Sequence, residues 1–156
     1  MQQITLKKKH FAGGSVYLTP GWISNGHWAI KRTWIKNNAV FASADTVSAF
    51  LGEKTSVTVK ENDSMVESIL DTVKDAQLDY VKTDWVHSKA GDDFNLLRVF
   101  KNCSGKAVFR EDYIQAFEIL SLVGTKPTDV FRSADSDFLL MPCRLEDKIL
   151  NQLDLA

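Results

Sequence analysis

Residues 15–35 read "SVYLTPGWISNGHWAIKRTWI" and carry the strongest structural signal in the chain. The stretch is rich in β-branched and aromatic residues, and Asn25-Gly26 separates two such runs. An Asn-Gly pair between β-prone runs is typical of a tight turn that joins antiparallel strands. We therefore predict a hairpin here. Pro20 lacks a backbone N–H and should lie at a strand end or edge.

Further strands are predicted on both sides of this hairpin. They are "QITLKKKHF" (3–11), "TSVTVKE" (55–61), "LDYVKTDWVH" (78–87), "FNLLRVFKN" (94–102), "GKAVF" (105–109), "DVFRS" (129–133) and "DFLLMPCRL" (137–145). Runs 78–87 and 94–102 bracket a short polar loop, so we expect them to pair as an antiparallel hairpin. The last two runs meet at Ala134-Asp135 and are expected to pair in the same way.

Two short helices are predicted from their boundary residues and spacing. Residues 43–52 have a choice of N-cap, Ser43 or Asp45, and Gly52 is a natural stop. Residues 111–122 carry apolar side chains at helical spacing and are expected to form a second helix, packed on the sheet.

A third helix, residues 64–76, has the clearest start signal. Ser64 and Glu67 have the spacing of a capping box, in which each side chain accepts a hydrogen bond from the backbone N–H of the other residue. The apolar stripe that follows consists of Val66, Ile69, Leu70 and Val73. This stripe should face the core.

The order of elements, with single helices between strands, indicates an α+β fold. We expect a mainly antiparallel sheet with two or three short helices, in a single domain covering residues 1–156. At the C-terminus, a short helical tail over residues 146–156 is expected. Its apolar face is formed by Leu145, Ile149, Leu150 and Leu153.

The composition excludes several classes of protein. A formal net charge of -1 excludes a general polycation, so contact with nucleic acid would need a local patch. No apolar run approaches the roughly 20 residues that span a bilayer, and the N-terminus does not resemble a signal peptide. Cys103 and Cys143 are forty positions apart. We interpret them as reduced thiols in a cytoplasmic protein, with a disulfide as the alternative.

No catalytic or metal-binding constellation stands out in the sequence. There is no Gly-rich phosphate loop, no HExxH and no GxSxG motif. The three histidines, His10, His27 and His87, lack a second ligand at metal-binding spacing. Two alternatives stay open: a cation bound by Asp92 and Asp93, or a Cys103 nucleophile with a histidine. We predict no catalytic residues, no metal and no cofactor, hence no enzyme.

Aromatic and basic residues are interleaved from Trp22 to Lys36. Exposed aromatics can stack on bases and basic side chains can neutralise phosphates. Strand alternation instead favours Trp28 and Trp34 as core residues with the basic side chains outside. The candidate nucleic-acid-binding residues are Lys7, Lys8, Lys9, Lys31, Arg32 and Lys36.

Residues 23–32 read "ISNGHWAIKR" and residues 137–145 read "DFLLMPCRL". Together with residues 39–52 and 106–120, these segments resemble, in order, parts of bacterial DNA sliding clamps. Clamps are the ring-shaped processivity subunits of replicative polymerases. The first segment resembles a clamp strand that passes through a Thr-Asp-Gly-His-Arg-Leu-Ala-like turn. The resemblance covers about half of the chain and implies a clamp-like domain, one unit of such a ring.

The closing strand of clamps ends in Met-Pro-Met-Arg-Leu and borders a hydrophobic groove that receives partner peptides. Met141-Pro142-Cys143-Arg144-Leu145 resembles this ending. The resemblance therefore implies that Met141, Pro142 and Arg144 bind a partner.

The last five residues resemble a peptide that binds in such a groove: Gln152-Leu153-Asp154-Leu155-Ala156. Peptides that dock on bacterial clamps resemble Gln-Leu-Ser/Asp-Leu-Phe, and here alanine replaces the aromatic residue. Gln152, Leu153, Asp154 and Leu155 are therefore candidate partner-binding residues. The alternative is that this segment is the end of the amphipathic helix and packs on the protein's own core.

The predicted function is a non-enzymatic, replication-associated protein that acts by protein–protein binding, with DNA contact secondary. The partner would be a bacterial sliding clamp, a polymerase component or a second copy, and the source a phage or mobile element. The helices 64–76 and 111–122 carry acidic residues, which oppose lining a DNA channel. The alternative function is a small inhibitor that binds a host enzyme or defence complex through these acidic faces.

Overall fold

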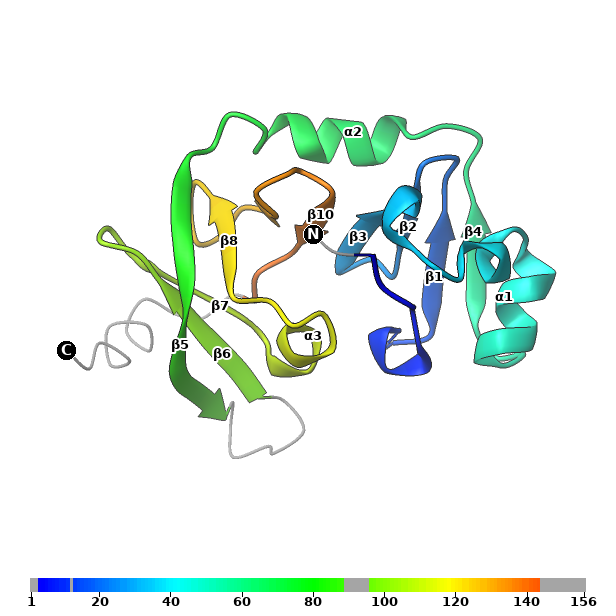
Figure 1. Ribbon diagram of the computed structural model, residues 1–156, viewed down its shortest axis with the longest axis horizontal. Helices are drawn as coiled ribbons and strands as arrows, with labels where there is room; N and C mark the ends of the chain where they lie inside the picture. Colours follow the sequence, from blue (N-terminus) through cyan, green and yellow to red (C-terminus); the bar gives the residue numbers. More distant parts are fainter. Residues whose placement is uncertain (1–2, 12, 89–95, 144–156) are drawn as a thin grey trace.

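The computed structural model describes residues 3–11, 13–88 and 96–143, and its central feature is one long sheet (Figure 1). Within this part of the chain the sheet has ten strands in the order β4-β1-β2-β3-β10-β9-β8-β5-β6-β7. The strands are β1 (Ser15–Leu18), β2 (Trp22–Ser24), β3 (Trp28–Lys31), β4 (Ser56–Val59), β5 (Leu78–Ser88), β6 (Leu96–Lys101), β7 (Lys106–Arg110), β8 (Ser121–Gly124), β9 (Phe131–Arg132) and β10 (Phe138–Leu140). β1 and β4 pair in parallel, and the other neighbours pair antiparallel.

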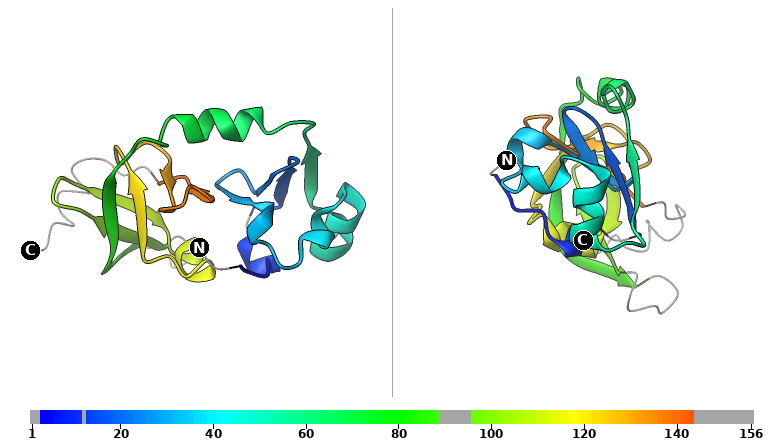
Figure 2. Two further views of the ribbon diagram at one scale, coloured as in Figure 1. Left: turned by 45° about the horizontal axis from the view of Figure 1, so that its top comes forward. Right: turned by 90° about the vertical axis from the view of Figure 1, so that its right-hand side faces the viewer.

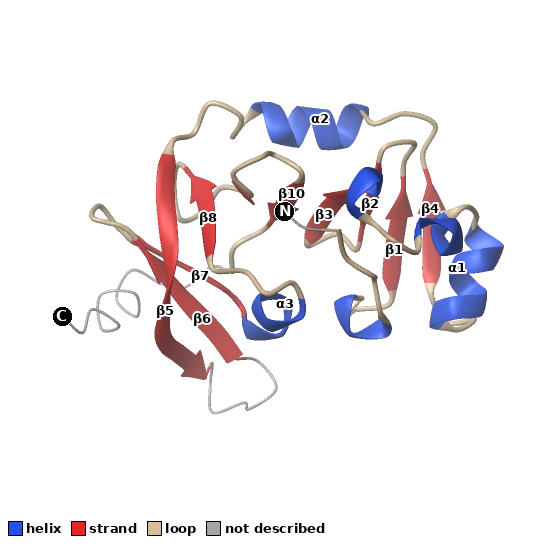
Figure 3. Cartoon of the chain, viewed as in Figure 1, coloured by secondary structure: helices blue, strands red, loops and turns tan. Residues whose placement is uncertain are grey.

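In the described ranges, three α-helices and three 3-10 helices accompany the sheet (Figure 3). They are η1 (Lys8–His10), η2 (Arg32–Trp34), η3 (Asn38–Phe41), α1 (Ala44–Leu51), α2 (Ser64–Asp71) and α3 (Glu111–Ala116). The described residues thus confirm an α+β fold with a mainly antiparallel sheet. None of their helices has the length and apolar character needed to cross a membrane.

The predicted hairpins form at their expected places. β2 and β3 pair across the Asn25-Gly26 turn, with Ile23 opposite Ile30. The Asn25 side-chain oxygen accepts hydrogen bonds from the backbone N–H groups of His27 (2.9 Å) and Trp28 (3.1 Å). Gly26 has a φ of 94°, which glycine tolerates better than other residues. The β5–β6 and β9–β10 hairpins form as well.

The main core lies on one face of the sheet and joins its two ends. Leu18 of β1 and Ile30 of β3 belong to the same cluster as Phe109 of β7. Aromatic rings pack edge to face in this core. The ring centroid of Phe109 lies 5.1 Å from that of Phe100 and 5.0 Å from that of Phe131. Such contacts add to the stabilisation by burial.

The opposite face carries a smaller core beneath α2. This helix crosses above the sheet from the β4 side to the β5 side (Figures 1 and 2). Val66 of α2, and Val73 and Ala76 in the turns after it, pack on strand residues of this face. The strand and loop residues are Trp22, Ala29, Val123, Val130 and Leu139.

The predicted helix 64–76 ends early, at Asp71, and the predicted capping box is absent. Asn62, not Ser64, supplies the capping oxygen: its side chain accepts hydrogen bonds from the backbone N–H (3.1 Å) and the hydroxyl (2.5 Å) of Ser64. Asp63 is the N-cap residue, but its carboxylate accepts a hydrogen bond from Gly21 N–H (2.9 Å) across the fold. The local cap therefore comes from Asn62, and the carboxylate of Asp63 is used in a tertiary contact instead.

The predicted helix 111–122 is also wrong in its second half. α3 stops at Ala116, and Ser121–Gly124 pairs with β5 and β9 as β8. The stop has the hydrogen bonds of a Schellman motif, Ile119 N–H to Ile114 O (3.0 Å) and Glu118 N–H to Gln115 O (3.2 Å). Glu118 occupies the left-handed position (φ 52°) where a glycine is usual, so the sequence gives no stop signal.

The N-terminal run 3–11 is not a strand, contrary to the prediction. Ile4 makes one parallel bridge with Ile35, and η1 follows. His10 explains the change of conformation, because its Nδ1 accepts a hydrogen bond from Lys7 N–H (2.9 Å). Its Nε2 then donates to Ala116 O (3.0 Å) at the end of α3, which joins η1 to α3.

Buried Arg132 fixes the segment that follows α2. Its guanidinium donates to the backbone oxygens of Val73 (3.0 Å) and Ala76 (2.6 Å). It also donates to those of Ser133 (3.1 Å) and Ala134 (3.0 Å). One side chain thus satisfies four carbonyl groups and anchors the end of α2 to β9.

We predict that Arg132→Met lowers the free energy of unfolding by about 2–4 kcal/mol, because it strips buried carbonyl groups of their donors. Lys74→Met, on the same segment, removes an exposed ion pair with Asp71 and should cost less than about 1 kcal/mol. Urea unfolding of both variants checks this. Equal losses would contradict an anchoring role for Arg132.

Acid should weaken the η1–α3 junction. Burial, the largest cause, lowers the pKa of His10, and a proton on Nδ1 would face the Lys7 N–H that now donates to it. The neutral imidazole therefore stabilises the fold above the ordinary histidine pKa of 6.5. That contribution is lost progressively as the pH falls below 6.5, because the unfolded chain then binds the proton more readily.

We predict that urea unfolding of the wild type loses more stability between pH 7.5 and pH 5.5 than that of His10→Gln. His27→Gln, at an exposed histidine, is the matched control and should keep the wild-type pH dependence. Parallel pH profiles for the wild type and His10→Gln would rule out this role of His10.

Candidate functional site

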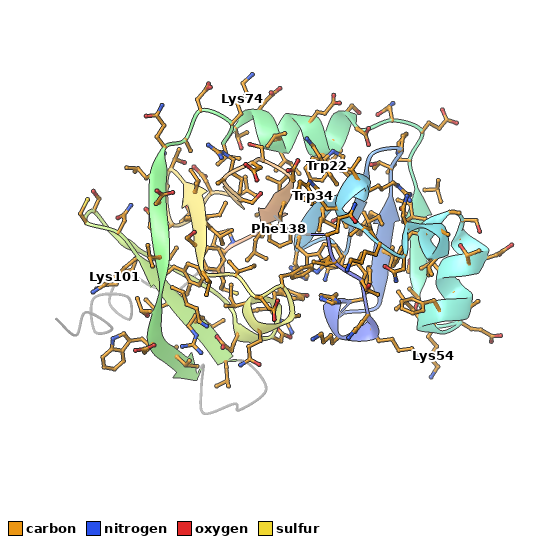
Figure 4. The ribbon with its side chains drawn as sticks, viewed as in Figure 1. Trp22, Trp34, Lys54, Lys74, Lys101 and Phe138 are labelled. Carbon is orange, nitrogen blue, oxygen red and sulfur yellow. The ribbon has the colours of Figure 1, made fainter. Side chains whose placement is uncertain are left out.

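An apolar groove lies between α2 and the sheet, with a volume of about 290 Å³. We call it the α2 groove. It is lined from α2 by Met65, Val66 and Ile69, from β1 to β3 and their turns by Tyr17, Thr19, Trp22, Ser24, Gly26, His27, Trp28 and Ala29, and from the second half of the chain by Val130, Leu139 and Met141. Trp22 lies below α2 in Figure 4. The volume is at the small end of ligand pockets, which suits a few side chains rather than a large cofactor.

The exposed part of the groove is hydrophobic. Met65, Ile69 and Met141 are 49%, 39% and 44% exposed, although all three line a concave apolar surface. Side chains of this kind gain free energy, about 25 cal/mol per Å², when a partner covers them. An exposed apolar groove is therefore a candidate contact surface.

The polar atoms of the groove wall are mostly bound within the protein. The Ser24 hydroxyl donates to Trp28 O (2.6 Å) and accepts from Gly26 N–H (3.0 Å). The Thr19 hydroxyl oxygen accepts from Trp22 N–H (3.0 Å). These hydrogen bonds stabilise the turns. A ligand in the groove would therefore be bound mainly by dispersion and by the burial of apolar surface.

One end of the groove is built by two segments far apart in the sequence. The backbone N–H of Met141 donates to His27 O (2.8 Å), which places Met141 beside the β2–β3 turn. Asn25 of the same turn donates from its side-chain nitrogen to the Tyr113 hydroxyl (2.9 Å). The Arg110 guanidinium lies 4.9 Å from the centre of the Tyr113 ring. α3 therefore supports this end of the groove from behind.

The structure places the predicted partner-binding residues as follows. Met141 lines the groove, and Pro142 follows it, half-buried. The remaining candidates lie outside the described residues: Arg144, Gln152, Leu153, Asp154 and Leu155. Ser24, Gly26, His27, Trp28 and Ala29, from the other segment that resembles clamps, all line the same groove.

Sequence reasoning did not find the α2 wall or the floor of the groove. Met65 and Ile69 lie one helical turn apart, but Ile69 was assigned to the core-facing stripe. Val130 and Leu139 belong to predicted strands, and the strand pattern does not indicate a cavity beside them. Trp28 is buried on β3, as strand alternation predicts; Trp34 packs partly buried against the main core, but from η2 and not from a strand.

The predicted nucleic-acid-binding residues fall into two groups, exposed lysines and side chains that make contacts within the protein. Lys7, Lys8, Lys9 and Lys36 are exposed. Arg32, in contrast, donates to Thr19 O (2.8 Å), Asn38 Oδ1 (3.0 Å) and Phe41 O (3.0 Å). Lys31 pairs with Asp137 (3.1 Å). The last two side chains thus also hold the fold.

The acidic residues of α3 are paired within the protein. Glu111 is buried and accepts two hydrogen bonds from Arg98 (2.6 and 2.7 Å). Burial raises its pKa, but the hydrogen bonds from Arg98 and Gln115 outweigh burial, so the pKa is lowered. Asp112 pairs with Arg110 (2.7 Å). Asp112 and Glu118 are nonetheless exposed, as are Glu67 and Asp71 of α2.

No metal site emerges from the described part of the chain. Its His, Cys, Asp and Glu side chains form no group of three that could hold a metal ion. Asp92 and Asp93 lie outside the described residues. Cys103 is exposed, with the Ser104 hydroxyl 3.7 Å from its sulfur, and neither Cys103 nor Cys143 is in a disulfide.

The sequence matches no family model, and comparisons with curated proteins and with solved structures find no significant match.

Proposed function

We propose that this is a non-enzymatic, replication-associated protein with a clamp-like domain, which binds a short peptide segment of a partner protein in the α2 groove. One observation carries the proposal: residues from segment 23–32 and from the described part (137–143) of segment 137–145, both of which resemble parts of sliding clamps, line one apolar groove. They are more than a hundred residues apart in sequence. Local β propensity cannot by itself account for their meeting at an exposed apolar cavity.

The groove fits a peptide with two or three apolar side chains. Its walls are Met65 and Ile69 on one side and Met141 on the other, with Trp22 and Leu139 between them. Two flexible methionines let such a wall adapt to different apolar side chains. Burial of the exposed parts of these residues, together with an aliphatic or aromatic anchor of the peptide, supplies the binding free energy.

The partner is a component of the bacterial replication machinery that carries a glutamine- and leucine-containing docking peptide; self-association of the chain is part of the same proposal. Contact with DNA is secondary and uses the lysines of η1. The alternative function, an inhibitor with acidic helix faces, has less support on α3, because Glu111 is buried and paired with Arg98.

The groove is tested with a fluorescent peptide, Gln-Leu-Asp-Leu-Phe, and the full chain. We predict saturable binding that weakens at least tenfold in Ile69→Asp, because a charge in the apolar wall must be desolvated. Leu120→Asp is the matched control: Leu120 is 70% exposed and does not line the groove. Fluorescence anisotropy gives both affinities.

An absence of peptide binding by the wild type, or equal weakening by Ile69→Asp and Leu120→Asp, would refute the groove as a docking site. Urea unfolding of each variant confirms that the comparison is made between folded proteins.

For DNA, we predict weak retention on a duplex column that decreases as salt rises, because released counterions drive phosphate binding. Replacing Lys7, Lys8 and Lys9 by glutamine should lower the eluting salt concentration. A matched triple variant of the exposed residues Lys74, Lys101 and Lys126 should change it less. Lys74 and Lys101 are labelled in Figure 4. Equal shifts in the two variants would show that net charge alone, and not the η1 patch, governs retention.

A further inference from the structure

Two of the three methionines of the chain line the α2 groove. The sequence contains Met1, Met65 and Met141 and no other methionine. Met65 lies on α2, and Met141 directly follows β10. The tertiary structure brings both into the wall of one groove. The hydrogen bond from Met141 N–H to His27 O (2.8 Å) fixes the second of them beside the β2–β3 turn.

Both methionine side chains are accessible from solution. Met65 is 49% and Met141 is 44% exposed, whereas Trp22 and Leu139, which also line the groove, are buried. The thioether sulfur of an exposed methionine is polarisable and is a common site of oxidation. An oxidant can therefore modify the wall of the groove without unfolding the protein.

Oxidation turns an apolar part of the wall into a polar one. One oxygen of hydrogen peroxide bonds to the thioether sulfur and the O–O bond breaks. The departing oxygen takes up the remaining proton and leaves as water. Sulfur loses two electrons in this step, and the peroxide is reduced by them. The product is a sulfoxide, a polar hydrogen-bond acceptor, where the thioether was at most a weak one.

A sulfoxide at these positions opposes ligand binding more than it opposes folding. In the free protein, water hydrates the sulfoxide oxygen, because Met65 and Met141 are both exposed. A bound apolar ligand removes that water, and a buried polar group without a hydrogen bond is costly. The nearby hydroxyl protons do not offset this cost. Ser24 already donates to Trp28 O (2.6 Å), and Thr19 donates to Trp22 O (3.3 Å).

We propose that Met65 and Met141 are oxidation sites that regulate the α2 groove. Peroxide converts them to sulfoxides, and the groove then loses its affinity for apolar ligands. Sulfoxide reductases reverse the modification, so the partner is bound in the reduced state and released in the oxidised state. This inference rests on the proposed function, because it concerns regulation of the same site.

The test compares the full chain before and after treatment with hydrogen peroxide, with peptide mass spectrometry to verify sulfoxide at Met65 and Met141. Fluorescence anisotropy with the Gln-Leu-Asp-Leu-Phe peptide gives the affinity. We predict that oxidation weakens binding at least tenfold. Incubation with the two methionine sulfoxide reductases, one for each sulfoxide epimer, should restore the original affinity.

Met65→Leu/Met141→Leu is the matched control, because it keeps Met1, Cys103 and Cys143 as targets of peroxide. Its affinity after peroxide should stay within about twofold of its own affinity before peroxide. Equal losses in the wild type and this variant would overturn the inference, because another residue would then mediate the effect. Urea unfolding should show that the oxidised wild type is folded; a loss of binding caused by unfolding would also overturn it.

A second probe separates this inference from the proposed function. If the reduced wild type does not bind the peptide, the proposed function fails, and the uncharged apolar dye Nile red decides the inference. Dye binding that is lost on oxidation in the wild type, but not in Met65→Leu/Met141→Leu, would support it. Dye binding that is absent from the reduced protein or unchanged by oxidation would overturn it. If reduced and oxidised wild type bind the peptide equally, the inference alone fails.

Discussion

The antiparallel pairing of β3 with β10 is the contact on which the rest of the structure depends. It joins strands β1–β4, in the first sixty residues, to strands β5–β10, which begin at Leu78, with Ile30 opposite Phe138 and Trp28 opposite Leu140. The register sends Phe138 and Leu140 into the main core and Leu139 to the opposite face, beneath α2. Moving it by one residue would exchange these faces and bring Leu139 out of the α2 groove.

The α2 groove is a consequence of this pairing together with the position of α2. The helix is tied down at its end, where Arg132 binds the carbonyl groups of Val73 and Ala76. Near its start, Gly21 donates a hydrogen bond to the side chain of Asp63. Between these anchors the helix lies over the β1, β2, β3 and β10 strands and leaves a cavity that its own side chains do not fill. An exposed apolar surface therefore remains where a partner can bind.

Local signals predicted the elements that local interactions make. The Asn25-Gly26 turn, the cap at Ser43 and the stop at Gly52 formed as expected, since each uses hydrogen bonds or backbone freedom of neighbouring residues. The end of α3 was not predictable, because Glu118 occupies a position where glycine is usual. The end of α2 was not predictable either, because Arg132, distant in sequence, binds the carbonyl group of Val73 in the turns that follow the helix.

The sequence by itself determined the fold class, most of the strands and the inward direction of Trp28, because alternation and turn chemistry are properties of short segments. It also identified Met141 as a partner-binding candidate, through a resemblance. Only the tertiary structure decided which residues share a surface. Met65, Ile69, Trp22 and Leu139 form one groove because strands and a helix distant in sequence meet there. Such a meeting depends on strand order and register, which no single stretch of residues encodes.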